Sequence, residues 1–179
     1  LFTDFSFLFY FLPVTLIFHR LALHLSASGR YSDLARWVVV IATLIFYGSA
    51  EPWYLVPFCS CVSLDFLWSR LLTRATAPRS RLLFLWASIL QNLTLLCLFK
   101  YSAPILGWVQ SQFPAEVLPA ILKRKSLPLP PGISFYTFES MSFIIDIYWR
   151  ETMAPRRWLD LFSFIAMFPR FIAGPIVRY

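Results

Sequence analysis

Charged side chains are scarce in this sequence of 179 residues. Asp, Glu, Lys and Arg together make up 14% of it, whereas 59% of the residues are hydrophobic. Soluble domains average about 25% charged and about 45–50% apolar residues. A chain with so few charged groups cannot cover its surface in water, which excludes a soluble globular domain. The mean hydropathy of +0.66 instead predicts a membrane protein whose main solvent is lipid.

Cysteine and histidine are also rare. Cys59, Cys61 and Cys97 all fall inside apolar runs and form neither a CxxC pair nor a Cys/His cluster, so we predict buried thiols and no metal site. His19 and His24 have no carboxylate or cysteine at ligand spacing. We therefore expect them to be polar side chains at the membrane interface rather than a general base or metal ligands. No bound cofactor is expected.

Basic residues outnumber acidic ones by 16 to 9, but they lie in the gaps between apolar runs. Without a folded basic face, nucleic acid is not an expected partner. Loops rich in Lys and Arg normally remain in the cytoplasm. This rule places the N-terminus outside the cytoplasm, with 123–125 as the exception because that basic triplet falls on the wrong side. The loop arginines are Arg30, Arg36, Arg70, Arg74, Arg79, Arg81, Arg150, Arg156 and Arg157.

The apolar runs predict an all-α, polytopic transmembrane helix bundle with a single domain. A spanning helix needs about 20 residues, so the chain has room for about five spans. We expect a bend at Pro13, a turn over 48–52, and only short interfacial helices in the proline-rich segment 101–131. We expect residues 158–179 to form an interfacial or re-entrant piece. The predicted spans are 5–25, 36–48, 53–70 (with Asp65), 82–100 (with Gln91 and Asn92) and 132–149.

The fifth run carries acidic residues at membrane depth. Glu139, Ser142 and Asp146 are spaced i, i+3, i+7 and share one helical face. An ionised acid at a helix centre costs about 2.5–3.5 kcal/mol on insertion scales and usually faces a bundle interior or an aqueous cavity. These residues either line a polar passage or pair with groups on neighbouring helices. Asp146 also has Arg150 at i+4 in the sequence, where an ion pair is expected. The opposite, apolar face is expected to carry Phe135, Phe138, Met141 and Ile145.

Several segments resemble the membrane-bound O-acyltransferases, in the branch of the alginate O-acetyltransferase and the teichoic-acid D-alanyl transfer protein. Residues 127–150, LPLPPGISFYTFESMSFIIDIYWR, resemble a signature of this branch, and 168–179, FPRFIAGPIVRY, resemble the block that follows. Residues 1–13 and 46–54 fit the start of the family. Glu139 departs from the pattern, which has Gln there. The motif residues are Gly132, Ser134, Phe135, Tyr136, Arg170 (where the family has a neutral residue), Gly174, Pro175 and Arg178.

The resemblance implies an enzyme that transfers an acyl group, above all acetyl, to hydroxyls of an envelope polysaccharide such as alginate. An activated acyl donor is then the co-substrate. The other partners are the lipid bilayer of the bacterial inner membrane, the rest of the acyltransferase and extracytoplasmic partner proteins. Within the motifs, Gly132 would let a helix start tightly after the proline run, and 174–175 would shape a broken segment.

The family uses a histidine in a membrane-embedded cavity as the base on the acceptor hydroxyl. That histidine lies further along family chains than the last block present here, and neither His19 nor His24 matches its position. We therefore expect an N-terminal part of the enzyme that has no catalytic residue of its own. A transporter or channel subunit is the alternative, because broken helices and intramembrane acids are natural there too.

Overall fold

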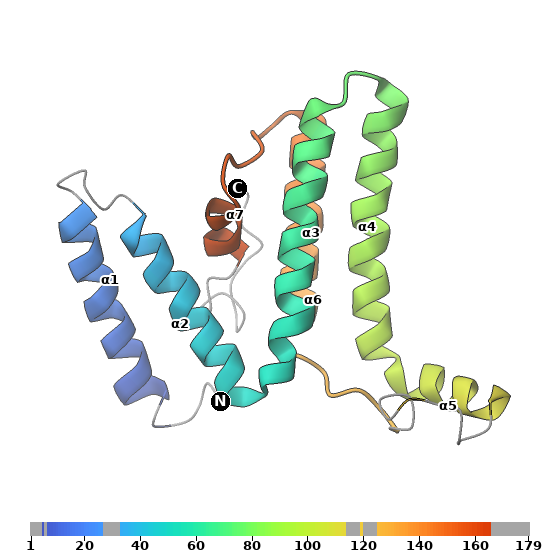
Figure 1. The fold of residues 1–179 in the computed structure, drawn as a ribbon, viewed down its shortest axis with the longest axis horizontal. Helices are drawn as coiled ribbons and strands as arrows, with labels where there is room; N and C mark the ends of the chain where they lie inside the picture. The colour runs from blue at the N-terminus through green and yellow to red at the C-terminus, as the bar shows by residue number, and fades with distance from the viewer. Residues whose placement is uncertain (1–4, 6, 27–32, 114–118, 120–124, 166–179) are drawn as a thin grey trace.

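The computed structural model describes residues 5, 7–26, 33–113, 119 and 125–165. These residues form helices joined by short connections, without a strand, which confirms the all-α prediction. Consecutive long helices run in opposite directions, and α6 returns beside α3 (Figure 1). The elements are η1 (Phe7–Phe11), α1 (Leu12–Ser26), α2 (Leu34–Ala50), η2 (Pro52–Tyr54), α3 (Leu55–Arg74), α4 (Pro78–Lys100), α5 (Ser102–Gln112), α6 (Ile133–Trp149) and α7 (Trp158–Ile165).

The aromatic ring of Phe58 lies where several helices meet. It stacks on Tyr47 of α2 with ring centroids 5.0 Å apart, and it meets Tyr136 of α6 edge to face at 5.2 Å. Phe162 of α7 lies against the same ring at 5.4 Å. All four side chains are at most 1% exposed. Offset and edge-to-face pairs of this kind add to the gain from burial, so this cluster holds α2, α3, α6 and α7 together.

The bend expected at Pro13 takes the form of a π-helical turn, η1, directly before α1. Proline has no N–H, and its ring would collide with the carbonyl four residues earlier in a regular helix. A wider turn at that point relieves the collision. The Thr15 hydroxyl donates to the Phe11 carbonyl at 2.8 Å, which satisfies one of the backbone oxygens in this turn.

The turn predicted over 48–52 is wrong in its extent. Helix α2 continues through Gly48 to Ala50, and only Glu51 adopts an extended conformation before η2 begins. The Glu51 N–H donates to the Tyr47 carbonyl at 3.3 Å, so the helical hydrogen bonding persists to the end of α2. Because Tyr47 is packed into the core on the preceding turn, the glycine at 48 does not end the helix.

Two stretches, 52–74 and 78–100, are long and apolar enough to cross a membrane, with mean hydropathies of 1.4 and 2.0. Helices α1, α2 and α6 are shorter, so length alone does not establish all five spans. Helix α3 extends to Arg74, beyond the predicted end at 70. Helix α5 is short and turns away from α4, as expected for the proline-rich segment (Figure 1). Of the predicted piece 158–179, only α7 lies within the described residues.

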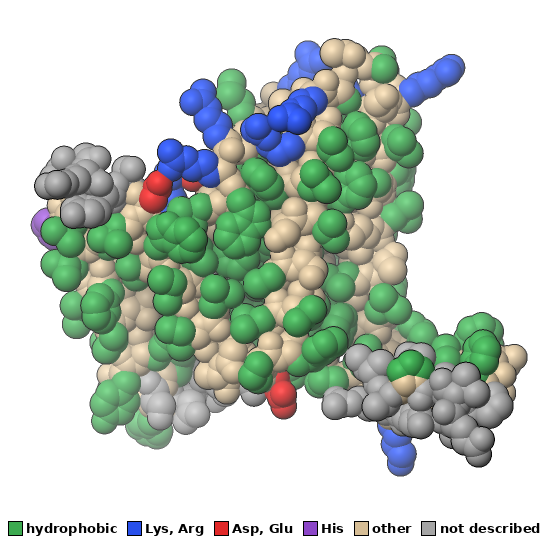
Figure 2. All heavy atoms as spheres, viewed as in Figure 1, with side chains coloured by type: hydrophobic (Ala, Val, Ile, Leu, Met, Phe, Trp, Pro, Cys, Tyr) green, Lys and Arg blue, Asp and Glu red, His purple; other side chains and the backbone are tan. Residues whose placement is uncertain are grey.

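The described arginines of the loops and helix ends lie at one end of the bundle (Figure 1). Lys and Arg side chains gather at that end, above a broad hydrophobic surface (Figure 2). Asp33 binds both Arg36, at 3.0 Å, and Arg157, and Arg36 reaches Asp160 at 2.9 Å. These ion pairs join the start of α2 to the start of α7.

Arg81, on the first turn of α4, connects the ends of two other helices. Its guanidinium donates to the carbonyls of Leu72 in α3, at 3.1 Å, and Tyr148 in α6, at 2.8 Å. It also lies 5.6 Å from the centre of the Tyr148 ring. The last carbonyls of a helix have no partner within the helix, so Arg81 provides hydrogen-bond donors to carbonyls that would otherwise lack one.

Replacing Arg81 with glutamine should lower the free energy of unfolding by about 1.5–3 kcal/mol, the usual contribution of hydrogen bonds to a charged group. Thermal unfolding in detergent measures the change. Arg79→Gln is the matched control, because Arg79 is exposed on the same turn of α4 and its side chain forms no hydrogen bond within the described residues. Equal stability of the two variants would contradict the role assigned to Arg81.

Candidate functional site

The family-like segment 127–150 forms the lead-in to α6 and the helix itself. Gly132 adopts φ 73° and ψ 9°, the left-handed conformation, directly before the helix. Its carbonyl accepts hydrogen bonds from the N–H groups of Phe135, at 2.9 Å, and Tyr136, at 3.0 Å. A residue with a Cβ is strained in this conformation, whereas glycine is not. The left-handed conformation of Gly132 is compatible with the predicted tight start of the helix after the prolines.

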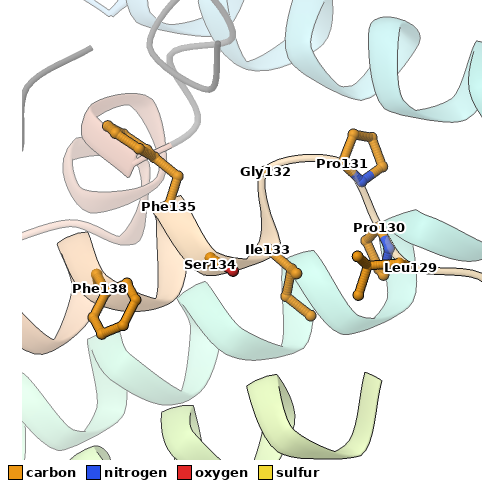
Figure 3. A pocket seen from close by; sticks show the side chains of 8 residues that line it. All are labelled: Leu129, Pro130, Pro131, Gly132, Ile133, Ser134, Phe135 and Phe138. Carbon is orange, nitrogen blue, oxygen red and sulfur yellow. The ribbon is translucent and has the colours of Figure 1, made fainter. Parts of the chain in front are cut away.

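A cavity of about 420 Å³ lies at this start of α6. Prolines of the lead-in form one side of it, and two phenyl rings of α6 form another (Figure 3). The motif residues Gly132, Ser134 and Phe135 line it, whereas Tyr136 points into the core instead. Ser134 provides the hydroxyl among mainly apolar walls. The full lining is Leu129, Pro130, Pro131, Gly132, Ile133, Ser134, Phe135 and Phe138.

The acidic side chains of α6 are buried. Glu139 is 1% exposed and Asp146 4%, whereas Ser142 is partly exposed. The regular helix over Ile133–Trp149 keeps the three on one face, at the edge of the buried surface.

The predicted apolar face opposite these residues is partly wrong. Phe135 precedes Glu139 by four positions and lies on the same face. Met141 is buried, with 8% exposure, although Phe138 is 46% exposed as expected. The buried side of α6 is thus wider than the pattern of acids suggested, because α3 and α4 both pack against it.

The ion pair expected between Asp146 and Arg150 is not formed. Helix α6 ends at Trp149, and Arg150 turns into the left-handed region at φ 64°, so the i+4 geometry of a helix does not hold. The Asp146 carbonyl accepts the N–H of Glu151 at 2.9 Å. One buried carboxyl oxygen of Asp146 has no hydrogen-bond partner within the described residues.

A second polar cluster, centred on Asp65, was missed by sequence reasoning. Asp65 of α3 is fully buried and accepts hydrogen bonds from Ser88 Oγ at 2.8 Å and Asn92 Nδ2 at 2.9 Å, both on α4. The Cys61 thiol donates to Asn92 Oδ1 at 3.1 Å. The hydroxyl of Ser140, on α6, lies near the same carboxyl but forms no hydrogen bond within the described residues. This Asp65 cluster therefore joins α3 and α4 through buried polar groups.

The spacing of these residues was the one sequence feature that pointed to this cluster. Cys61 and Asp65, and likewise Ser88 and Asn92, stand four positions apart and so share a face on their helices. The sequence pattern alone does not predict that this face of α3 packs against this face of α4. Trp68 Nε1 donating to Gln91 Oε1 at 2.6 Å is a second polar link between α3 and α4.

The remaining candidate residues lie apart from α6 or outside the described part. His24 is exposed and His19 half-buried, both on α1, which packs on α2 and η1. Within the described ranges, no three His, Cys, Asp or Glu side chains come close enough together to hold a metal ion. The motif residues Arg170, Gly174, Pro175 and Arg178 lie outside the described residues.

Comparison with known proteins found no matching family model and no matching solved structure. Curated relatives cover 97% of this chain. It is 37% identical to the probable alginate O-acetylase of Pseudomonas putida and 34% identical to that of Pseudomonas aeruginosa. The peptidoglycan O-acetyltransferase of Helicobacter pylori is 24% identical. The chain spans about a third of the length of these relatives, 34%, 32% and 36% respectively. By this likeness, the chain belongs to the membrane-bound O-acyltransferases, in the branch of the alginate O-acetylases.

Proposed function

We propose that this chain forms one wall of an enzyme that transfers an acetyl group to hydroxyls of an envelope polysaccharide. In this reaction the sugar oxygen attacks the carbonyl carbon of an activated acetyl donor. The new C–O ester bond forms as the bond to the leaving group breaks, and the hydroxyl proton passes through a base to that leaving group. The observation that carries the proposal is the 37% identity to an alginate O-acetylase over 97% of the chain.

The cavity at the start of α6 is the proposed entrance for the acceptor sugar. It lies at the end of α6 opposite the arginine-rich loops, which is the extracytoplasmic end if those loops face the cytoplasm. The rings of Phe135 and Phe138 offer flat apolar faces for the C–H face of a sugar, and Ser134 offers a hydroxyl to it. Glu139 and Asp146 continue from this cavity along α6 toward the other end.

The same orientation supports a topology with the N-terminus outside and five helices crossing the inner membrane: α1, α2, α3, α4 and α6. In this arrangement the acetyl donor, a co-substrate rather than a bound cofactor, reaches the passage from the cytoplasm. The rest of the enzyme would enclose α6, and extracytoplasmic proteins would present the polysaccharide. No comparison favours the alternative of a transporter, since the relatives found are O-acetylases and an O-acetyltransferase.

Complementation tests the proposed function. The full-length protein should restore O-acetyl esters to alginate in a bacterium that lacks its own alginate O-acetylase, as measured by proton NMR of the purified polymer. Residues 1–179 alone should restore none, because the described histidines lie on α1, away from α6. Unacetylated alginate from the full-length strain, with the protein present in the membrane, would contradict the proposal. Turnover by 1–179 that depends on His19 or His24 would contradict the expected division of roles.

Replacing Phe138 with alanine should raise the KM for the acceptor about tenfold, the equivalent of about 1.4 kcal/mol of lost contact with the sugar. The KM for the acetyl donor should not change, because Phe138 lies at the acceptor end of the passage. Steady-state kinetics in proteoliposomes with alginate oligosaccharides measure both constants. Leu90→Ala is the matched control, since Leu90 is similarly exposed on α4 and does not line the cavity. An unchanged acceptor KM would rule out the cavity as the entrance.

A further inference from the structure

Four exposed arginines at one end of the bundle have no ion pair. Arg74 ends α3, Arg79 lies in the first turn of α4, and Arg150 and Arg156 belong to the connection between α6 and α7. Within the described part of the chain, none of these four side chains forms an ion pair or a hydrogen bond. The ion pairs at this end use Arg36 and Arg157 instead. Asp33 and Asp160 are thereby already paired with other arginines.

The four arginines form one surface because Arg81 holds their elements together. Its guanidinium binds Leu72 O near the end of α3 and Tyr148 O near the end of α6, and Arg81 itself belongs to the first turn of α4. The helix ends at or next to Arg74, Arg79 and Arg150 are therefore within reach of one side chain, and the connection that begins at Arg150 continues to Arg156. Figure 2 shows the Lys and Arg side chains of this end as a cap over the hydrophobic surface below.

Apolar side chains stand exposed among and just below these arginines. Trp149 is 63% exposed and Met153 88%, one directly before Arg150 and the other between Arg150 and Arg156. On α4, Leu83 is 65% exposed and Trp86 53%, one and two turns below Arg79. Tryptophan is enriched at membrane interfaces, and long basic side chains extend from there to the headgroups. Charge and apolar surface thus alternate here as at the headgroup level of a bilayer.

We propose that Arg74, Arg79, Arg150 and Arg156 form a docking surface for the headgroups of anionic phospholipids. The planar guanidinium binds phosphate oxygens in pairs, and several phosphates could be held side by side. Trp149 and Met153 enter the interfacial layer beside the bound headgroups, which a soluble phosphate compound would leave in water. Such lipids brace the α3–α4 and α6–α7 connections at this end of the bundle. This surface lies at the end opposite the acceptor cavity and does not depend on the proposed acetyl transfer.

Lipid retention measured by native mass spectrometry tests this surface. The protein, purified in a neutral detergent, is exposed to mixed micelles of phosphatidylglycerol or phosphatidylcholine with identical acyl chains. The wild type should retain phosphatidylglycerol in preference. Each Arg→Gln change should weaken this retention about fivefold, from the contribution of one basic residue near an anionic surface, and the quadruple variant R74Q/R79Q/R150Q/R156Q more than about a hundredfold. The matched control is K100Q/K125Q, which removes exposed charges on α4 and in the lead-in to α6.

Three outcomes would overturn the proposal. The first is equal retention of both lipids by the wild type, and the second is equal loss in the quadruple variant and the lysine control. The third is arginine-dependent binding of inorganic pyrophosphate without a preference for phosphatidylglycerol, which would assign the surface to a soluble phosphate compound. If the quadruple variant unfolds, the single changes R150Q and R156Q, both in the connection outside the helices, still have to give their fivefold losses.

Discussion

Glu139→Leu in the full-length protein is expected to reduce acetyl transfer at least about a hundredfold, a loss of about 2.7 kcal/mol of transition-state stabilisation. Glu139 is 1% exposed and follows directly on Phe138, which lines the acceptor cavity. It is thus the first acidic group beyond the proposed entrance, on the face that also carries Ser142 and Asp146. A leucine there removes the polar group from the passage and keeps most of the volume.

Glu139→Gln provides the control for shape and hydrogen bonding. The resemblance to the family places a glutamine at this position. A glutamine amide should therefore replace the Glu139 carboxyl in the passage, and this variant should keep most of the activity. Both variants are compared by initial rates in proteoliposomes containing equal amounts of folded protein. Full activity of Glu139→Leu at normal expression would assign Glu139 a structural role in the packing of α6.

The second large effect concerns stability. Asp65→Leu should lower the free energy of unfolding by about 3 kcal/mol, because the buried donors of Ser88 and Asn92 lose the acceptor around which they are arranged. For a chain of this size the midpoint of thermal unfolding should then fall by about 6–12 °C, measured in detergent. Most of this loss of stability comes from buried donors that are left without an acceptor, rather than from the loss of a single hydrogen bond.

A double-mutant cycle separates these two contributions. Asp65→Leu combined with Asn92→Leu removes the carboxyl and its main donor together, so the double variant should be more stable than the sum of the single changes predicts. Thr94→Leu, on the same helix, is the control partner, since it does not belong to the Asp65 cluster. Additive effects with Asn92→Leu, or wild-type stability of Asp65→Leu alone, would show that the cluster does not hold α3 and α4 together.

Much of the local structure could be predicted from the sequence. The apolar runs locate α1, α2, α3, α4 and α6, and the prolines explain the short α5 and the π-helical turn before α1. These features depend on side chains within a few residues, whose effect on the backbone is similar in any fold. The same holds for Gly132, where the lead-in of prolines followed by glycine predicts the tight start of α6.

Local sequence patterns mispredict the structure where the packing of distant segments decides it. Gly48 suggested the end of α2, but burial of Tyr47 against Phe58 keeps the helix intact through that point. Asp146 and Arg150 have the spacing of an ion pair, but α6 ends between them.

The sequence by itself determined that this chain is an all-helical member of a membrane acyltransferase family, with two acids on one face of its fifth run. Composition and motif suffice for that conclusion, because both can be read along the chain. Only the tertiary structure revealed the Asp65 cluster and the role of Arg81. Asp65 meets Asn92, and Arg81 meets Tyr148, across distances in sequence that no local pattern encodes. Such contacts exist because α3, α4 and α6 pack side by side and must satisfy their buried polar groups with one another.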